Sequence, residues 1–312
     1  MNDLEVIRGQ ELKSLNLGNE LFTRWTNYLD ATPKTVETYS RAIRQFTLYL
    51  KANAILQPKR EDIVAYKEEL SKTHKATTVS SYLMAVKQFF KWTSLEGLYP
   101  NIAEHVKSVK IDKGHKKDYL TTAQVKKLLN SIDRSSLGGL RDYAILMLMI
   151  TTGLRTIEIV RADVEDIRTV GDFTALFIQG KGRTDKTEYI KITQPVEEAI
   201  RAYLKARGSK DSKQPLFTSN SNRDNNSRLT TRSISRIAKT HLVDAELISD
   251  RLTAHSLRHT TATLNLLAGA TVEETSQLLR HTNINTTLIY SHALERAKNN
   301  SEQRITDFIF ND

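Results

Sequence analysis

Hydrophobic residues in the first third of the chain recur with the period of an α-helix. The clearest stripe has successive spacings of 3, 4, 3 and 4 residues, which places its members on one helical face. Its members are Val36, Tyr39, Ile43, Phe46 and Leu50. A second stripe consists of Val79, Leu83, Val86 and Phe90. The pattern from Glu20 to about Glu96 therefore predicts an all-helical N-terminal region.

Prolines and polar residues divide this region into separate helices. Pro33, Pro58 and Pro100 fall between or after the periodic segments, where a missing N–H does least harm. Thr35 and Thr77 are the expected N-caps. The helices predicted from these signals span residues 20–30, 35–52, 60–70 and 77–96.

A lysine-rich segment without apolar periodicity follows. Its lysines, around Gly114, are Lys107, Lys110, Lys113, Lys116 and Lys117. Such a segment cannot bury enough apolar surface to fold alone, so it is predicted to be a linker. Its positive charge suggests that it crosses the phosphate backbone of DNA, and a solvated tether is the alternative. The expected organisation is an N-terminal domain (1–106), a basic linker (107–118) and a C-terminal domain (119–312).

The C-terminal region mixes helical and strand patterns. Residues 120–125 open a helix, and residues 140–151 form a largely apolar one. Residues 173–178 and 188–192 read as strands on either side of a Gly180–Arg183 turn, which predicts a small antiparallel sheet. From about residue 195 the pattern is helical again, broken by a polar loop. The fold class expected is mainly α with a small antiparallel β-sheet.

Charge narrows the class of partner. The chain of 312 residues has a formal net charge of +10, and the window 201–258 alone holds 12 Lys+Arg against 5 Asp+Glu. Such a surplus favours a polyanion such as nucleic acid, with simple solubility as the alternative. There are 0 cysteines, which excludes disulfides, Cys-ligated zinc and a thiol nucleophile. The acidic N-terminus and the lack of a long apolar run predict a cytoplasmic protein.

Several residues could bind or protonate a phosphate. Arg155 opens a helix after a glycine, and Lys181 stands between two glycines at a hairpin tip. His255 and Arg258 are three residues apart, so both can reach one phosphate. Taken singly, Arg155 could instead form a structural pair with Glu158, and Lys181 could belong to an ordinary polar turn.

Two further residues complete the set of candidates. His259 follows His255 by four residues, which invites a zinc interpretation, but no acidic residue completes it and an inward-packed His259 is expected. Tyr290 follows His281 by nine residues. A tyrosine is protonated at neutral pH, so it attacks only when its proton is removed. Tyr290 as a simple packing residue is the alternative.

The joint pattern resembles the tyrosine recombinase family, also called lambda-type integrases, and in length most resembles the short Xer-type and mobile-element members. The matching segments, in family order, are residues 153–158, 180–182, 255–259, 278–281 and 286–292. The resemblance implies a helical N-terminal clamp that binds core DNA and a tyrosine recombinase catalytic domain. Arg280 departs from the pattern, because glycine is commoner there.

The resemblance also implies roles for the residues. Arg155 and Arg258 would grip the scissile phosphate, and His281 would hydrogen-bond to it. Lys181 would protonate the leaving 5′-oxygen, and His255 would assist proton removal from Tyr290, which would form a 3′-phosphotyrosyl link. No metal or other cofactor is implied. Glu158 is expected to support Arg155.

Expected partners are double-stranded DNA with paired inverted half-sites and three further copies of the chain, as a homotetramer on synapsed DNA. Candidate DNA contacts, each with a merely solvated face as alternative, are Arg41, Arg44, Lys87, Lys91, Arg183, Arg232, Arg236 and Lys239. An apolar cluster at the C-terminal end is expected to dock on a neighbouring protomer, or else on its own domain. It consists of Ile305, Phe308, Ile309 and Phe310.

The function expected is site-specific recombination, either to integrate or excise a mobile element or to resolve replicon dimers, on nucleoid-associated DNA of a bacterium. A catalytically silent DNA-binding regulator of the same fold is the alternative, and a type IB topoisomerase is a third interpretation. The complete set of phosphate-handling residues argues against the regulator. The short helical N-terminal domain and the His281-to-Tyr290 spacing argue against the topoisomerase.

Overall fold

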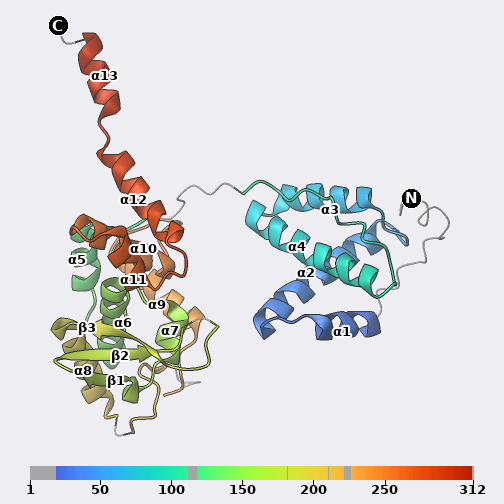
Figure 1. Cartoon of the computed structure of the whole chain (residues 1–312). Helices are drawn as coiled ribbons and strands as arrows, with labels where there is room; N and C mark the ends of the chain where they lie inside the picture. Colours follow the sequence, from blue (N-terminus) through green and yellow to red (C-terminus); the bar gives the residue numbers. More distant parts are fainter. Residues whose placement is uncertain (1–18, 112–117, 181, 210, 221–225, 311–312) are drawn as a thin grey trace. The chain divides into compact units, whose positions relative to one another are not determined.

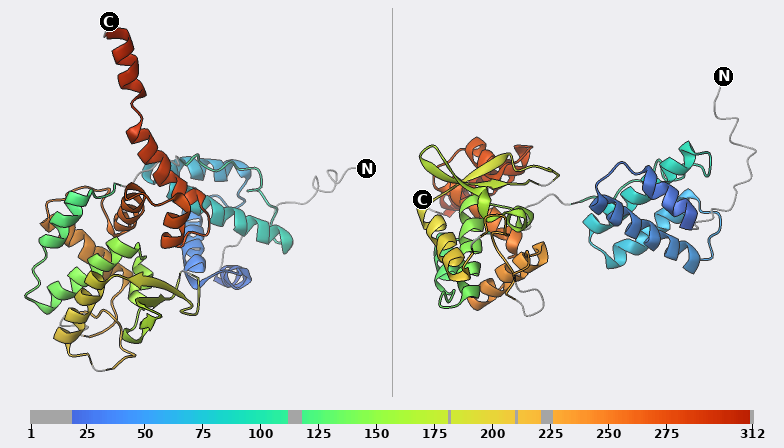
Figure 2. Two further views of the ribbon diagram at one scale, coloured as in Figure 1. Left: turned by 60° about the vertical axis from the view of Figure 1, so that its left-hand side comes forward. Right: turned by 90° about the horizontal axis from the view of Figure 1, so that it is seen from below.

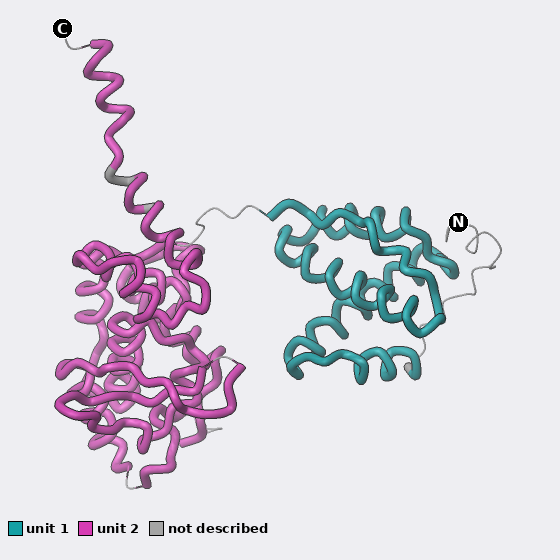
Figure 3. The backbone as a smooth tube through the Cα atoms, in the orientation of Figure 1, with its two compact units in different colours: residues 1–113 teal, residues 114–312 magenta. Residues whose placement is uncertain are grey.

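The computed structural model describes residues 19–111, 118–180, 182–209, 211–220 and 226–310. The chain divides into two compact units, residues 1–113 and 114–312 (Figure 3). The boundary lies within the segment predicted to be a linker. Lys113, Gly114, Lys116 and Lys117 lie outside the described residues, whereas Lys107 and Lys110 are exposed.

The N-terminal unit is helical, as predicted. Its helices are α1 (Asn19–Tyr28), α2 (Pro33–Ala52), α3 (Arg60–Thr73) and α4 (Ala76–Leu95). The two apolar stripes meet in its core, because α2 packs on α4 and Ile43, Phe46, Leu83 and Phe90 are all buried there. Trp25 of α1 joins this core with an edge-on contact to the Phe89 ring, 5.5 Å between centroids.

The predicted N-caps of this unit were wrong. The hydroxyl of Thr32 caps α2 by accepting from the Thr35 backbone N–H, 3.4 Å away, and Pro33 follows at the first helical position. Lys75 precedes α4 as its N-cap residue, without a side-chain hydrogen bond. Both helices therefore begin earlier than predicted.

The second unit contains helices, a short 3-10 helix and a small sheet. Its helices are α5 (Thr122–Asn130), α6 (Leu137–Thr152), α7 (Thr156–Arg161), η1 (Val164–Asp166), α8 (Gln194–Arg207), α9 (Thr231–Asp244), α10 (Ala254–Leu267), α11 (Val272–Leu279), α12 (Asn285–Lys298) and α13 (Ser301–Phe310). The apolar helix α6 contacts α8, α10 and the sheet, and it lies in the middle of this unit (Figure 1).

The strands found in the described residues form one antiparallel sheet in the order β1-β2-β3. They are β1 (Ile167–Val170), β2 (Phe173–Ile178) and β3 (Glu188–Ile192). The two predicted strands are confirmed as β2 and β3, paired so that Leu176 faces Ile190. β1 was missed. The fold is thus mainly α with a small antiparallel sheet, as expected.

The C-terminal helix α13 has no buried residue. Its ten residues are all exposed, including the predicted apolar cluster, in which Phe308 is 90% exposed. The left view of Figure 2 shows this helix extending away from the other elements of its unit. The alternative of packing on its own domain is not what this structure shows. Among the described residues, none of the helices is both long and apolar enough to cross a membrane.

Candidate active site

Arg155 is placed by the turn between α6 and α7. Gly153 ends α6 in a left-handed conformation, with φ of +62°, and Arg155 is the N-cap residue of α7. A Cβ on Gly153 would lie 2.4 Å from Cδ2 of Leu279, so any other residue would strain the backbone of this turn and displace the Leu279 side chain. Glu158 then holds Arg155 as predicted: Oε2 accepts from the Arg155 backbone N–H (2.8 Å) and Oε1 from Nη1 (2.9 Å).

Arg258 comes from the buried face of α10. Its side chain donates to the carbonyl oxygens of Gly153 and Leu279, which tie together the ends of α6 and α11. Arg258 is only 3% exposed. A buried guanidinium held by neutral carbonyls keeps its positive charge available for an anion, because these partners do not neutralise it.

His281 and Tyr290 follow from α11 and α12. His281 comes shortly after the end of α11, and its Nδ1 is 2.8 Å from the hydroxyl of the buried Thr287. That contact orients the imidazole, because it occupies one of the two ring nitrogens. Tyr290 lies in the first half of α12 and is 4% exposed.

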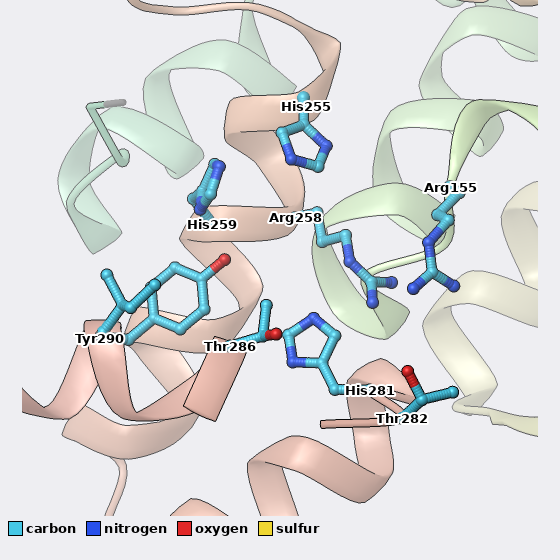
Figure 4. Close-up of a pocket in the computed structure, with 9 residues that line it drawn as sticks. Arg155, His255, Arg258, His259, His281, Thr282, Thr286 and Tyr290 are labelled. Carbon is cyan, nitrogen blue, oxygen red and sulfur yellow. The ribbon is translucent and has the colours of Figure 1, made fainter. Parts of the chain in front are cut away.

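These residues surround one cavity of about 290 Å³. Figure 4 shows Arg155 and Arg258 with their guanidinium groups side by side, the His281 ring beside Arg258, and the Tyr290 hydroxyl pointing into the same space. The lining thus combines two positive guanidinium groups, imidazole nitrogens and one hydroxyl. Such a set can bind a phosphate and bring a hydroxyl to it.

Electrostatics reinforce this arrangement. Burial, followed by the charges of Arg155 and Arg280, lowers the pKa of Arg258 to about 10, so that it stays protonated at neutral pH. Burial and the nearby arginines, Arg258 first, lower the pKa of His281 to about 4, so that it is neutral at pH 7. Burial raises the pKa of Tyr290, with Arg258 opposing the rise. Tyr290 therefore needs a proton acceptor before it can attack.

His259 is half-buried with its Nδ1 turned inward, and it also has a place at the cavity that was not predicted. Its ring lines the cavity and contacts those of His255 and Tyr290, with centroids 4.7 and 5.2 Å apart. The i,i+4 spacing from His255 already places both rings on one helical face, which was the signal for this position. No cluster of three potential metal ligands occurs among the residues that the structure describes.

Three other lining residues were not predicted: Thr282, Thr286 and Ile289. Thr282 lies before α12, and Thr286 lies in the first turn of that helix. Both are between His281 and Tyr290 in the sequence, and this proximity was the only signal for them. Their hydroxyl groups offer further hydrogen-bond donors at the wall of the cavity.

Lys181 lies outside the described residues. Its neighbours Gly180 and Gly182 belong to the β2–β3 connection, in which Gly182 has a φ of +81°. Arg161, at the end of α7, donates to the Gly180 carbonyl at 3.1 Å. α7, which begins after Arg155, therefore also holds Gly180, the residue before Lys181.

The candidate DNA contacts are distributed over both units. In the first unit Arg41 pairs with Glu37 at 3.1 Å, and Arg44 lies over the Phe22 ring. The others, apart from the half-buried Lys87 and Lys239, are exposed: Lys91, Arg183, Arg232 and Arg236.

Lys239 is a candidate DNA contact that shares a cavity with Arg155 and Arg258. It lines a second cavity, of about 670 Å³, whose wall also includes Arg155, His255 and Arg258. Its Nζ donates to the Ser249 carbonyl at 2.9 Å. Arg183 is paired with Glu188 at 2.9 Å, close to Lys181 in sequence.

Comparison with known proteins shows the family to which the chain belongs. The family model described as the phage integrase family matches residues 118–296. The chain belongs to the phage integrase family. The N-terminal SAM-like domain of phage integrases matches residues 22–97. The resemblance stated from the sequence is therefore confirmed.

A tyrosine recombinase XerA from Pyrococcus furiosus is 31% identical over 283 residues, which cover 90% of this chain and 92% of that protein. The fold resembles that of the XerH site-specific recombinase bound to palindromic difH substrate, with a TM-score of 0.70, 20% identity and coverage of 89% and 83% of the two chains. It also resembles a lambda integrase tetramer bound to a Holliday junction, with a TM-score of 0.70, 16% identity and coverage of 93% and 80%.

Proposed function

We propose that this phage integrase family member is a site-specific DNA recombinase that cleaves and rejoins strands through a 3′-phosphotyrosyl intermediate. The observation that carries the proposal is the shared cavity: the Tyr290 hydroxyl and the guanidinium groups of Arg155 and Arg258 line the same 290 Å³ space. A phosphate in that space contacts both arginines and faces the hydroxyl of Tyr290.

The reaction follows from these groups. Tyr290 Oη attacks phosphorus, its proton passes to His255, and the bond from phosphorus to the 5′-oxygen breaks. Lys181 gives a proton to that oxygen, which leaves as a 5′-hydroxyl. Arg155 and Arg258 offset the negative charge that grows on the five-coordinate phosphorus, and the neutral His281 hydrogen-bonds to an oxygen. A 5′-hydroxyl from a partner duplex reverses the steps, because the phosphotyrosyl bond keeps the energy of the phosphodiester.

Covalent capture tests the chemistry. Wild type, Tyr290→Phe and a control, Tyr189→Phe, are incubated with supercoiled genomic or element DNA, and the reaction is quenched with detergent. Tyr189 is an exposed residue of β3 outside the cavity. Wild type and Tyr189→Phe are expected to retain DNA at a recurring site with a 3′-phosphotyrosyl end, and Tyr290→Phe none. Covalent attachment by Tyr290→Phe would refute the assignment of the nucleophile.

We also infer that the active assembly is a homotetramer on two duplexes with paired inverted half-sites, where α13 docks on a neighbouring protomer. The exposed apolar side chains of α13 support this, since such surfaces usually mark an interface. The similar fold of a lambda integrase tetramer on a Holliday junction supports it further. Under this proposal the enzyme acts in the bacterial cytoplasm on nucleoid-associated DNA, either for a mobile element or on replicon dimers.

Truncation after Lys298 tests the role of α13. The shortened protein is expected to bind one half-site as wild type does, but to lose cooperative binding of the second half-site and most recombination. Recombination at the wild-type rate would refute the docking of α13 on a neighbour.

A further inference from the structure

Arg280 has a backbone conformation that few side chains tolerate. It is the C-cap residue of α11, with φ of +54° and ψ of +49°. In this left-handed region glycine is favoured, because the Cβ of other residues crowds the following carbonyl oxygen. An arginine at such a position raises the question of what its side chain contributes.

The side chain of Arg280 reaches the carboxylate that holds Arg155. Its Nη2 is 3.0 Å from Oε2 of Glu158, and its Nη1 donates to the Leu278 carbonyl at 2.8 Å. The exposed fractions of the two charged side chains are 12% for Arg280 and 1% for Glu158. Glu158 is therefore shared between two arginines, with Oε1 facing Arg155 and Oε2 facing Arg280.

Because Glu158 is shared with Arg280, it forms fewer hydrogen bonds with the Arg155 side chain. An arginine and a carboxylate tend to form two parallel hydrogen bonds, which would use two guanidinium donors and neutralise the charge. Here Oε2 is occupied by Arg280 and by the Arg155 backbone N–H, so Oε1 alone accepts from the Arg155 side chain. The other donors of the Arg155 guanidinium remain at the cavity.

The net charge of these residues also favours a positively charged cavity. Arg155, Arg258 and Arg280 carry three positive charges and Glu158 carries one negative charge, which leaves a surplus of two. Glu188, whose charge also reaches Arg280, is itself paired with Arg183 at 2.9 Å. Without Arg280 the surplus would be one.

We propose that Arg280 is a positioning residue for strand cleavage: it holds Oε2 of Glu158, limits Glu158 to one side-chain contact with Arg155, and so leaves Arg155 oriented and charged for the scissile phosphate. This role rests on the proposed function, because it concerns the same phosphate. Arg280 itself acts through Glu158.

The first experiment measures single-turnover cleavage of a nicked half-site duplex at saturating protein, with half-site affinity and melting temperature beside it. Arg280→Gly suits the backbone but removes the charge, and Arg280→Asn does the same while retaining a side chain. Both are expected to cleave about tenfold more slowly, with affinity changed less than about threefold; loss of one direct donor to a transition state costs more. Arg280→Lys keeps the charge without the planar fork and is expected to recover part of the rate.

A control variant replaces a left-handed residue far from Arg280 in the sequence. Ala54 also has a left-handed conformation, with φ of +52°, and belongs to the other unit. Ala54→Gly is therefore expected to leave cleavage unchanged. If Arg280→Gly fails to fold, Arg280→Asn provides the same comparison.

Glu158→Gln in the Arg280→Gly background gives the sharper readout. The amide oxygen of the glutamine still accepts from the Arg155 backbone, but the negative charge that Arg280 no longer balances is gone. The double variant is expected to cleave at least about threefold faster than Arg280→Gly, because one charge restores the surplus. A residue that merely capped α11 would show no such rescue.

Two results overturn the role of Arg280: wild-type cleavage by both neutral variants, or a double variant that cleaves no faster than Arg280→Gly. These results are distinguishable from failure of the proposed function. If wild type itself formed no phosphotyrosyl complex, the proposed chemistry would be refuted, and the positioning role with it.

Discussion

Gly153 gives the most direct test of how the fold places the active site. Its backbone has φ of +62°, and a Cβ there would lie 2.4 Å from Cδ2 of Leu279. In Gly153→Ala the left-handed backbone costs about 1–2 kcal/mol, and overpacking against Leu279 costs about 1–3 kcal/mol more. The expected loss in free energy of unfolding is therefore about 2–5 kcal/mol.

Gly208 is the matched control. It also has a left-handed backbone, with φ of +69°, but among the described residues, apart from its chain neighbours, no atom lies within 4 Å of its Cβ position. Gly208→Ala is thus expected to lose only the backbone contribution, about 1–2 kcal/mol. The difference between the two variants measures the contact with Leu279.

Urea unfolding separates the two units of the chain. Both tryptophans, Trp25 and Trp92, belong to the core of the N-terminal unit, so their fluorescence reports that unit alone. Far-UV circular dichroism follows both units. Gly153→Ala is expected to shift the dichroism transition and leave the tryptophan transition in place. Equal destabilisation by Gly153→Ala and Gly208→Ala would refute the steric argument.

Leu83→Ala removes a side chain from the buried core of the N-terminal unit and is expected to lower its free energy of unfolding by about 2–5 kcal/mol. Tryptophan fluorescence during urea unfolding measures this loss. Destabilisation of the catalytic unit instead would contradict the division into units. Burial and the nearby arginines hold the pKa of His281 near 4. Because this is below the unfolded value, His281 favours folding above about pH 6.5, and that contribution is lost as the pH falls toward 4; an imidazole NMR titration midpoint above pH 6 would be inconsistent with this. Lys239→Ala is expected to weaken DNA binding and lower the salt dependence by about one unit; an unchanged slope would remove Lys239 from the contacts.

The helices were predictable because their signals are local. Apolar stripes at helical spacing placed α2 and α4. The stripe of α4 is fully buried, and that of α2 is buried except for the half-buried Val36 and Tyr39. The caps were missed by a few residues, since Thr32 and Thr35 are equally good cap residues in sequence and only the backbone decides between them. β1 was missed because its four residues show the burial pattern intermediate, exposed, exposed, intermediate, without the alternation that marks a strand.

The side chains that can act on a phosphate could be inferred from the amino-acid sequence, because their types and their order are local properties of the chain. How these side chains share charge depends on the fold. Glu158 and Arg280 are 122 residues apart, and Arg258 and Gly153 are 105 apart, yet each pair is in contact. The pKa of His281 and the burial of Tyr290 likewise depend on distances between separate helices, which spacing along the chain does not encode.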